Sequence, residues 1–141
     1  MLENIIIALE NFCIHQIREE YKLTQTLFDE ITINVYIDIE TEDMKNYRVY
    51  LASDLKFMQR ISYLFLEEEL SNEQTLIDMA LETANLIVGS AKVISEDENK
   101  NLFTIKTPHL INIDKFNLEY SEFSVIEVGD DKLLLSIKEL S

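Results

Sequence analysis

The sequence predicts an α+β fold, a mostly antiparallel sheet with amphipathic helices packed on it. Residues 30–40 alternate between apolar and polar side chains, as expected of a strand that buries one face of an antiparallel sheet. Residues 3–20 and 73–94 instead repeat their apolar side chains at helical spacing. Strands and helices do not alternate regularly along the rest of the chain, so a parallel sheet built of βαβ units is not expected.

The first half of the chain predicts a helix followed by a hairpin. In the helix over 3–20, Cys13 falls on the apolar stripe with Leu9 and Phe12, which predicts a buried structural thiol rather than a nucleophile. The apolar side of the strand over 30–40 consists of Ile31, Ile33, Val35, Ile37 and Ile39. After a polar turn at 42–45, residues 46–53 are expected to form the partner strand.

The second half predicts two helices and then three strands. One helix is expected over 55–68, capped by Ser53 or Asp54, and another from 73 to about 94, capped by Ser71 or Asn72. The acidic segment 95–101 is expected to be a loop. The three strands are expected near 102–107, 117–128 and 132–138. The predicted order is therefore α-β-β-α-α-β-β-β.

Composition limits the classes of function. The chain has 141 residues and no linker-like segment, which predicts a single domain over 1–141. Twelve Lys and Arg against 27 Asp and Glu give a net charge of −15, and a field of that sign argues against binding nucleic acid or an anionic membrane. The chain has one cysteine, and neither a signal peptide nor a membrane span is recognised, so a cytoplasmic protein is expected.

The helix over 73–94 carries the candidate functional residues. Its apolar stripe should face the sheet and consists of Leu76, Ala80, Ala84, Ile87, Ala91 and Ile94. On the other side, Asp78, Glu82, Asn85 and Gly89 fall within about 60° of one another around the helix axis. Glu82 and Asn85 are i,i+3 neighbours, so both side chains can reach one target. Gly89 costs about 1 kcal/mol relative to alanine inside a helix, but it leaves room for another backbone to approach.

The Glu-x-x-Asn spacing has little specificity alone. It occurs four times, at Glu69/Asn72, Glu82/Asn85, Glu96/Asn99 and Glu98/Asn101. Only Glu82/Asn85 lies inside a strongly periodic helix, with Asp78 four residues before it and Gly89 four residues after it. The alternative interpretation is an ordinary solvated helix face with a tolerated glycine. No spacing typical of a calcium, zinc or nucleotide site occurs, so no metal site is expected on this chain.

This arrangement resembles a known family. The pattern Asp78-x-x-x-Glu82-x-x-Asn85-x-x-x-Gly89 is similar to the signature helix of the CheX/CheC/FliY chemotaxis phosphatases. Thr107-Pro108, 22 residues after Asn85, resembles the Pro-containing strand end of that family. CheC-like members usually carry two such helices. The first helix here has no Glu-x-x-Asn, so the single copy resembles CheX.

The resemblance implies a phosphatase that acts on the aspartyl phosphate of a CheY-like response-regulator receiver domain. In this scheme Asn85 orients the hydrolytic water, Glu82 pairs with a lysine of the receiver, and Asp78 and Gly89 take part in docking. The receiver holds the Mg²⁺ ion, so no cofactor is expected from this chain. A homodimer through an exposed sheet edge is also expected. The alternative is a catalytically silent binding or assembly module of the same fold, such as a flagellar-switch or signalling adaptor.

Overall fold

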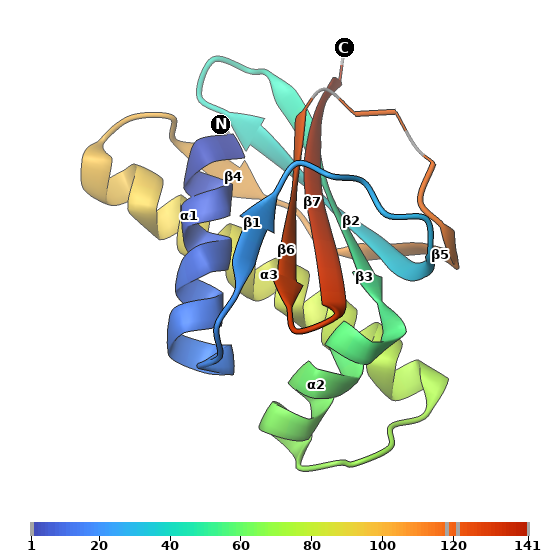
Figure 1. Ribbon diagram of the computed structural model, residues 1–141. Coiled ribbons are helices and arrows are strands. Elements are labelled where there is room, and N and C mark those ends of the chain that lie inside the picture. The colour runs from blue at the N-terminus through green and yellow to red at the C-terminus, as the bar shows by residue number, and fades with distance from the viewer. Residues whose placement is uncertain (1, 118, 121, 141) are drawn as a thin grey trace.

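A computed structural model of the chain describes residues 2–117, 119–120 and 122–140 (Figure 1). The fold is α+β, as predicted, and every strand pair in the described sheet is antiparallel. Among the described residues, no helix is both long and apolar enough to cross a membrane. The elements in chain order are α1 (Leu2–Phe12), the π-helical turn η1 (Cys13–Ile17), β1 (Lys22–Thr24), β2 (Ile31–Thr41), β3 (Asn46–Asp54), α2 (Leu55–Leu66), α3 (Glu73–Glu98), β4 (Phe103–Ile105), β5 (His109–Lys115), β6 (Glu122–Val128) and β7 (Asp131–Leu140).

The sheet is built around the predicted hairpin of β2 and β3. Its seven strands follow the order β1-β6-β7-β3-β2-β4, and β5 pairs with β2 as well. β2 is long enough to hold two short partners on its outer side, with β4 along Ile39–Thr41 and β5 along Ile31–Tyr36. In the hairpin, Val35 lies opposite Leu51, which keeps the apolar residues of both strands on one face.

The main core lies between that apolar face and the helices. The β2 residues Ile33, Val35, Ile37 and Ile39 are completely buried there. Figure 1 shows α3 running across one face of the sheet, α1 beside it, and α2 at the end where β3 finishes. Because α3 uses one side for this packing, its opposite side is left free of the core.

The polar side of β2 is more buried than the alternation predicts. Thr32 and Asn34 are each only 1% exposed, with β5 paired alongside them and Phe28 and Phe116 near Thr32. The Asn34 side-chain amide donates to Oδ1 of Asn112 at 2.7 Å and to the carbonyl of Asp114 at 3.0 Å. These bonds satisfy the amide where water cannot reach it. β5 was not predicted, and it supplies the acceptors for this buried amide.

The first helix ends earlier than predicted. α1 stops at Phe12, and a π-helical turn replaces the α-helix expected to continue to residue 20. The backbone N–H of Arg18 donates to the carbonyl of Cys13, five residues back, at 2.7 Å. Arg18 itself adopts a left-handed conformation with φ of 59°, which ends the helical path and leads the chain into β1. β1 was not predicted either.

The acidic segment after residue 94 is partly helical, which corrects the predicted loop over 95–101. α3 continues to Glu98 because Ser95 is buried against α1, where the Asn4 amide donates to Ser95 Oγ at 3.0 Å and to Glu98 Oε1 at 3.0 Å. The strand predicted over 117–128 begins at Glu122. Residues 118 and 121 of that prediction lie outside the described residues, as do residues 1 and 141 of the predicted domain.

Cys13 provides a direct test of the core. The residue is completely buried, and burial raises the pKa of its thiol to about 12. Since the thiolate is the reactive form, we expect native protein at pH 8 to resist Ellman's reagent, whereas urea-unfolded protein should react rapidly. The folded pKa lies above the unfolded value of 9.0, so this residue should make folding less stable as pH rises from about 9 toward 12. Rapid stoichiometric labelling of native protein would contradict the burial of this thiol.

Candidate functional site

α3 positions the candidate residues because both its ends and its buried side are well defined. Of the two predicted caps, Asn72 is the one used, and its side chain accepts from the backbone N–H of Thr75 at 2.8 Å. The predicted apolar stripe faces the core: Ala80, Ala84, Ile87 and Ala91 are buried, and Leu76 and Ile94 are partly buried. This stripe fixes the rotation of α3 about its axis and therefore decides which residues face outward.

The predicted line of residues lies on the outward side of α3. Asp78, Glu82 and Asn85 are exposed, and Gly89 is half-buried. Asp78 accepts a hydrogen bond from the Gln74 amide at 2.9 Å, so it is held within its own helix. Among the described residues, Glu82 and Asn85 have no side-chain hydrogen-bond partner. Both side chains are thus available to a molecule that approaches this face.

Gly89 lies where the face is open. A Cβ atom built on this residue would meet no other atom within 4 Å. Packing within this chain therefore does not require a glycine here. The clearance that it provides is on the outside of the helix, one turn beyond Asn85, where a second molecule would approach.

Each of the three other Glu-x-x-Asn pairs has at least one member with a structural role. They are Glu69/Asn72, Glu96/Asn99 and Glu98/Asn101. Asn72 caps the start of α3 and Asn99 caps its end in a left-handed conformation, while Glu98 accepts from Asn4. Asn101 also has a positive φ, of 55°. Glu82/Asn85 therefore differs from the other pairs in its lack of structural contacts with the described residues, which the spacing in the sequence does not reveal.

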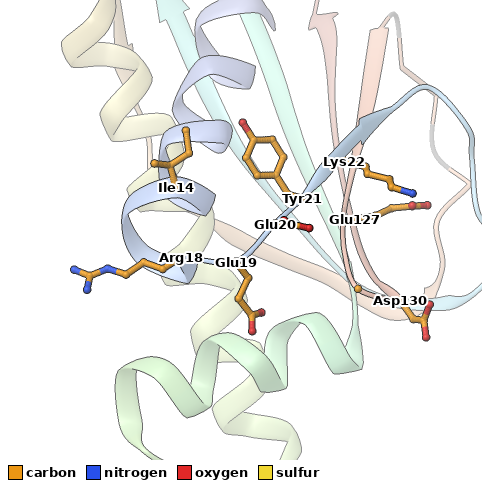
Figure 2. A pocket seen from close by; sticks show the side chains of 9 residues that line it. Ile14, Arg18, Glu19, Glu20, Tyr21, Lys22, Glu127 and Asp130 are labelled. Carbon is orange, nitrogen blue, oxygen red and sulfur yellow. The ribbon is translucent and has the colours of Figure 1, made fainter.

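The cavities of the described residues lie away from this face. A cavity of about 930 Å³ opens between the π-helical turn and β1, next to the β6–β7 turn. Figure 2 shows its charged side chains, among them Arg18, Lys22 and Asp130, pointing in different directions rather than toward a common centre. Neither Glu82 nor Asn85 lines this cavity or the other main ones. An open helix face cannot enclose a small substrate by itself, so the chemistry of this pair requires a partner surface.

The face also carries two apolar residues that the sequence analysis did not single out. Leu86 and Val93 are 40% and 54% exposed, although both belong to a helix with a well-formed apolar stripe. Helical periodicity could have identified both residues, because they fall outside the apolar stripe and on the same side of the helix as Glu82.

Among the residues that the structure describes, no metal site is apparent. In residues 2–117, 119–120 and 122–140, no group of three or more His, Cys, Asp or Glu side chains is placed to hold an ion. We expect calorimetric titration of the isolated protein with Mg²⁺ to give no more binding than a generic acidic surface gives. A stoichiometric, sub-micromolar Mg²⁺ or Zn²⁺ site would contradict a mechanism in which the partner supplies the ion, and would favour a self-sufficient metallohydrolase.

The fold and this face define a class of protein: an α+β module that carries a carboxylate and an amide on the exposed side of a helix. Comparison with known proteins places the fold more narrowly. No family model and no curated protein matches the chain. Solved structures of chemotaxis proteins do match it along nearly its whole length.

Three of these structures illustrate the likeness. CheX from Vibrio vulnificus matches with a TM-score of 0.79 at 15% identity, over 97% of both chains. A CheC-like superfamily protein from Shewanella sp. PV-4 matches with a TM-score of 0.79 at 14% identity, over 99% of this chain and 97% of the other. A chain of the CheX–CheY–BeF₃–Mg²⁺ complex from Borrelia burgdorferi matches with a TM-score of 0.68 at 14% identity, over 97% of both. The protein therefore has a CheX-like fold, as the signature helix predicted.

Proposed function

We propose that this protein is a phosphatase that hydrolyses the aspartyl phosphate of a CheY-like receiver domain. The observation that carries the proposal is the pair Glu82 and Asn85, exposed on α3 of a CheX-like fold and free of hydrogen bonds to the described residues. A fold-related CheX has been solved in complex with CheY, BeF₃ and Mg²⁺, which supports a receiver as the kind of partner.

Asn85 is suited to orient the attacking water. Its amide both donates and accepts hydrogen bonds and carries no charge, so it can hold a water beside an anionic phosphoryl group without repelling it. The water oxygen forms a bond to phosphorus while the bond from phosphorus to the aspartyl oxygen breaks. The aspartate leaves as a carboxylate. One proton of the water stays on the oxygen that is now bound to phosphorus, and the other passes to another oxygen of the product phosphate. This is a positioning task, and it needs no nucleophile from this chain.

Glu82 is suited to a different task. A carboxylate placed beside the attacking water would repel the phosphoryl group, but one turn away it can pair with a lysine of the receiver. Such a pair would hold α3 against the receiver at the position where Asn85 meets the water. The receiver would supply the Mg²⁺ ion that neutralises the phosphoryl charge.

The direct experiment is the decay of a receiver phosphorylated on its aspartate, with and without this protein. We expect the decay to accelerate in proportion to the protein concentration at low concentration and to saturate at high concentration. Unchanged decay over a series that reaches clear binding would favour the silent module instead.

Gly89 tests whether this face is the docking surface. Gly89→Ala should leave stability unchanged or raise it by up to about 1 kcal/mol, because the added methyl group meets no atom and glycine disfavours the helix. Gly89→Arg should remain folded but block the approach of the receiver. Thermal unfolding and phosphate decay would be measured for both variants. Full activity of Gly89→Arg would mean that the receiver docks elsewhere.

The expected homodimer remains a prediction. The described sheet has β1 at one edge and β4 with β5 at the other, and Leu110 of β5 is 42% exposed. Either edge leaves backbone groups to which a second copy could add a strand.

A further inference from the structure

A row of small and apolar side chains continues the candidate site toward the C-terminal end of α3. Leu86 and Val93 are seven residues apart and lie on the same side of the helix, about 10 Å apart along its axis. Both are well exposed, at 40% and 54%. Gly89 and the exposed Ser90 lie between them. These four residues, Leu86, Gly89, Ser90 and Val93, are called the α3 socket below.

The spacing of the socket is that of a side-chain receptor. Residues at i, i+3, i+4 and i+7 of a helix surround the depression into which one side chain of a packed neighbour inserts. Here the walls are Leu86 and Val93, and Gly89 contributes no side chain to the floor. The space above Gly89 is open, since a Cβ there would meet nothing within 4 Å. The socket is therefore open to an apolar side chain that approaches from outside.

We propose that the α3 socket seats one aliphatic or aromatic side chain of the receiver, and that this contact adds to the affinity of docking. The proposal rests on the function proposed above. The socket does not take part in the hydrolysis itself, because none of its members offers a group that could hold the water. Leu86 and Val93 are thus docking residues, and Glu82 and Asn85 are the residues that meet the reacting groups.

The continuity of the socket with the candidate site identifies the occupant. The next depression along the helix is formed by Glu82, Asn85, Leu86 and Gly89, so the two depressions share Leu86 and Gly89. A molecule that fills the socket contacts Leu86 and Gly89 and therefore lies next to Asn85. Burial of apolar surface is a general source of affinity, and it adds to what a charge pair at Glu82 contributes. We therefore assign the socket to the receiver, because the receiver is the molecule whose phosphate meets Asn85.

The test separates binding from hydrolysis. The variants are Leu86→Ser, Val93→Ser and the double variant. Leu70→Ser is the control, because Leu70 is 89% exposed and precedes the first turn of α3, well over ten residues before the socket. Two quantities would be measured: the concentration dependence of phosphate decay, and the affinity for a receiver activated with beryllium fluoride, which cannot be hydrolysed. We expect the double variant to raise the half-saturating concentration and the dissociation constant about tenfold. The maximal decay rate should stay within about twofold, and Leu70→Ser should match the parent protein in both.

Several results would overturn the inference. Parent-like affinity and rate in the double variant would mean that the socket is empty in the complex. A lower maximal rate with unchanged affinity would mean that these residues act on hydrolysis instead. Conversion of a dimer to a monomer in the double variant, seen by sedimentation, would assign the socket to a second copy of this chain. In all three cases the parent protein remains active, whereas failure of the proposed function would appear as no acceleration by the parent protein itself.

Discussion

Asn85→Ala should reduce the maximal acceleration of receiver dephosphorylation by on the order of 10²-fold, because the variant loses the group that positions the attacking water. The affinity for the receiver should change little, since Asn85 is proposed to contact water rather than the receiver. Asn85 is exposed in the interior of α3, so its truncation should change the free energy of unfolding by no more than about 0.5 kcal/mol. Single-turnover decay at saturating protein would measure the maximal rate, and thermal unfolding would measure the stability.

The control for this variant has to be another exposed asparagine inside a helix. Asn11 of α1 meets that requirement and makes no side-chain hydrogen bond to the described residues. Asn99 also follows a glutamate by three residues, but it caps α3 with φ of 52°, a left-handed conformation that costs alanine about 1 kcal/mol or more. Asn11→Ala should therefore retain full activity and stability. If Asn85→Ala were as active as Asn11→Ala, the role assigned to Asn85 would be rejected.

Glu82→Ala should weaken the binding of the activated receiver by on the order of 30-fold and slow hydrolysis as well. Truncating one partner of a charge pair leaves the other charge unpaired in the interface, which is the costly part of the loss. The affinity of the parent protein should also fall as salt is added, and the variant should lose part of that dependence. Titration of the receiver at two ionic strengths would measure both changes.

Glu96→Ala is the matched control for the charge. Glu96 is exposed on the same helix, so its removal changes the net charge by the same amount. Its loss should leave the affinity for the receiver nearly unchanged, because it lies about four turns from Glu82. If both variants weakened binding equally, the effect would belong to the overall charge of the protein and not to a pair formed by Glu82.

The site was accessible to sequence reasoning because helix periodicity is local. The apolar stripe of α3 fixes which residues face outward, so periodicity alone places Asp78, Glu82 and Asn85 on one exposed line. In the same way, the alternation of apolar and polar residues in β2 predicts which face of the hairpin is turned toward the core. Both patterns depend only on neighbours within a few turns or residues, and both lie in long elements where the pattern repeats several times.

Other features depended on contacts between distant parts of the chain. β1 has three residues and is a strand only because it pairs with β6, about a hundred residues later. β5 pairs with β2 across a register shift, and its residues alternate too weakly to predict a strand. α3 extends to Glu98 because Asn4 of α1 bonds to its last turn. None of these hydrogen bonds leaves a periodic signal in the segment itself.

The sequence by itself determined the α+β class and the exposed line on α3, including the carboxylate and amide on which the proposed function depends. Only the tertiary structure decided that Glu82 and Asn85 have no partner among the described residues, that the other Glu-x-x-Asn pairs are used as caps or contacts, and that Leu86 and Val93 remain uncovered. The physical reason is that periodicity assigns a residue to a side of its own helix, whereas the packing of distant elements decides what covers that side.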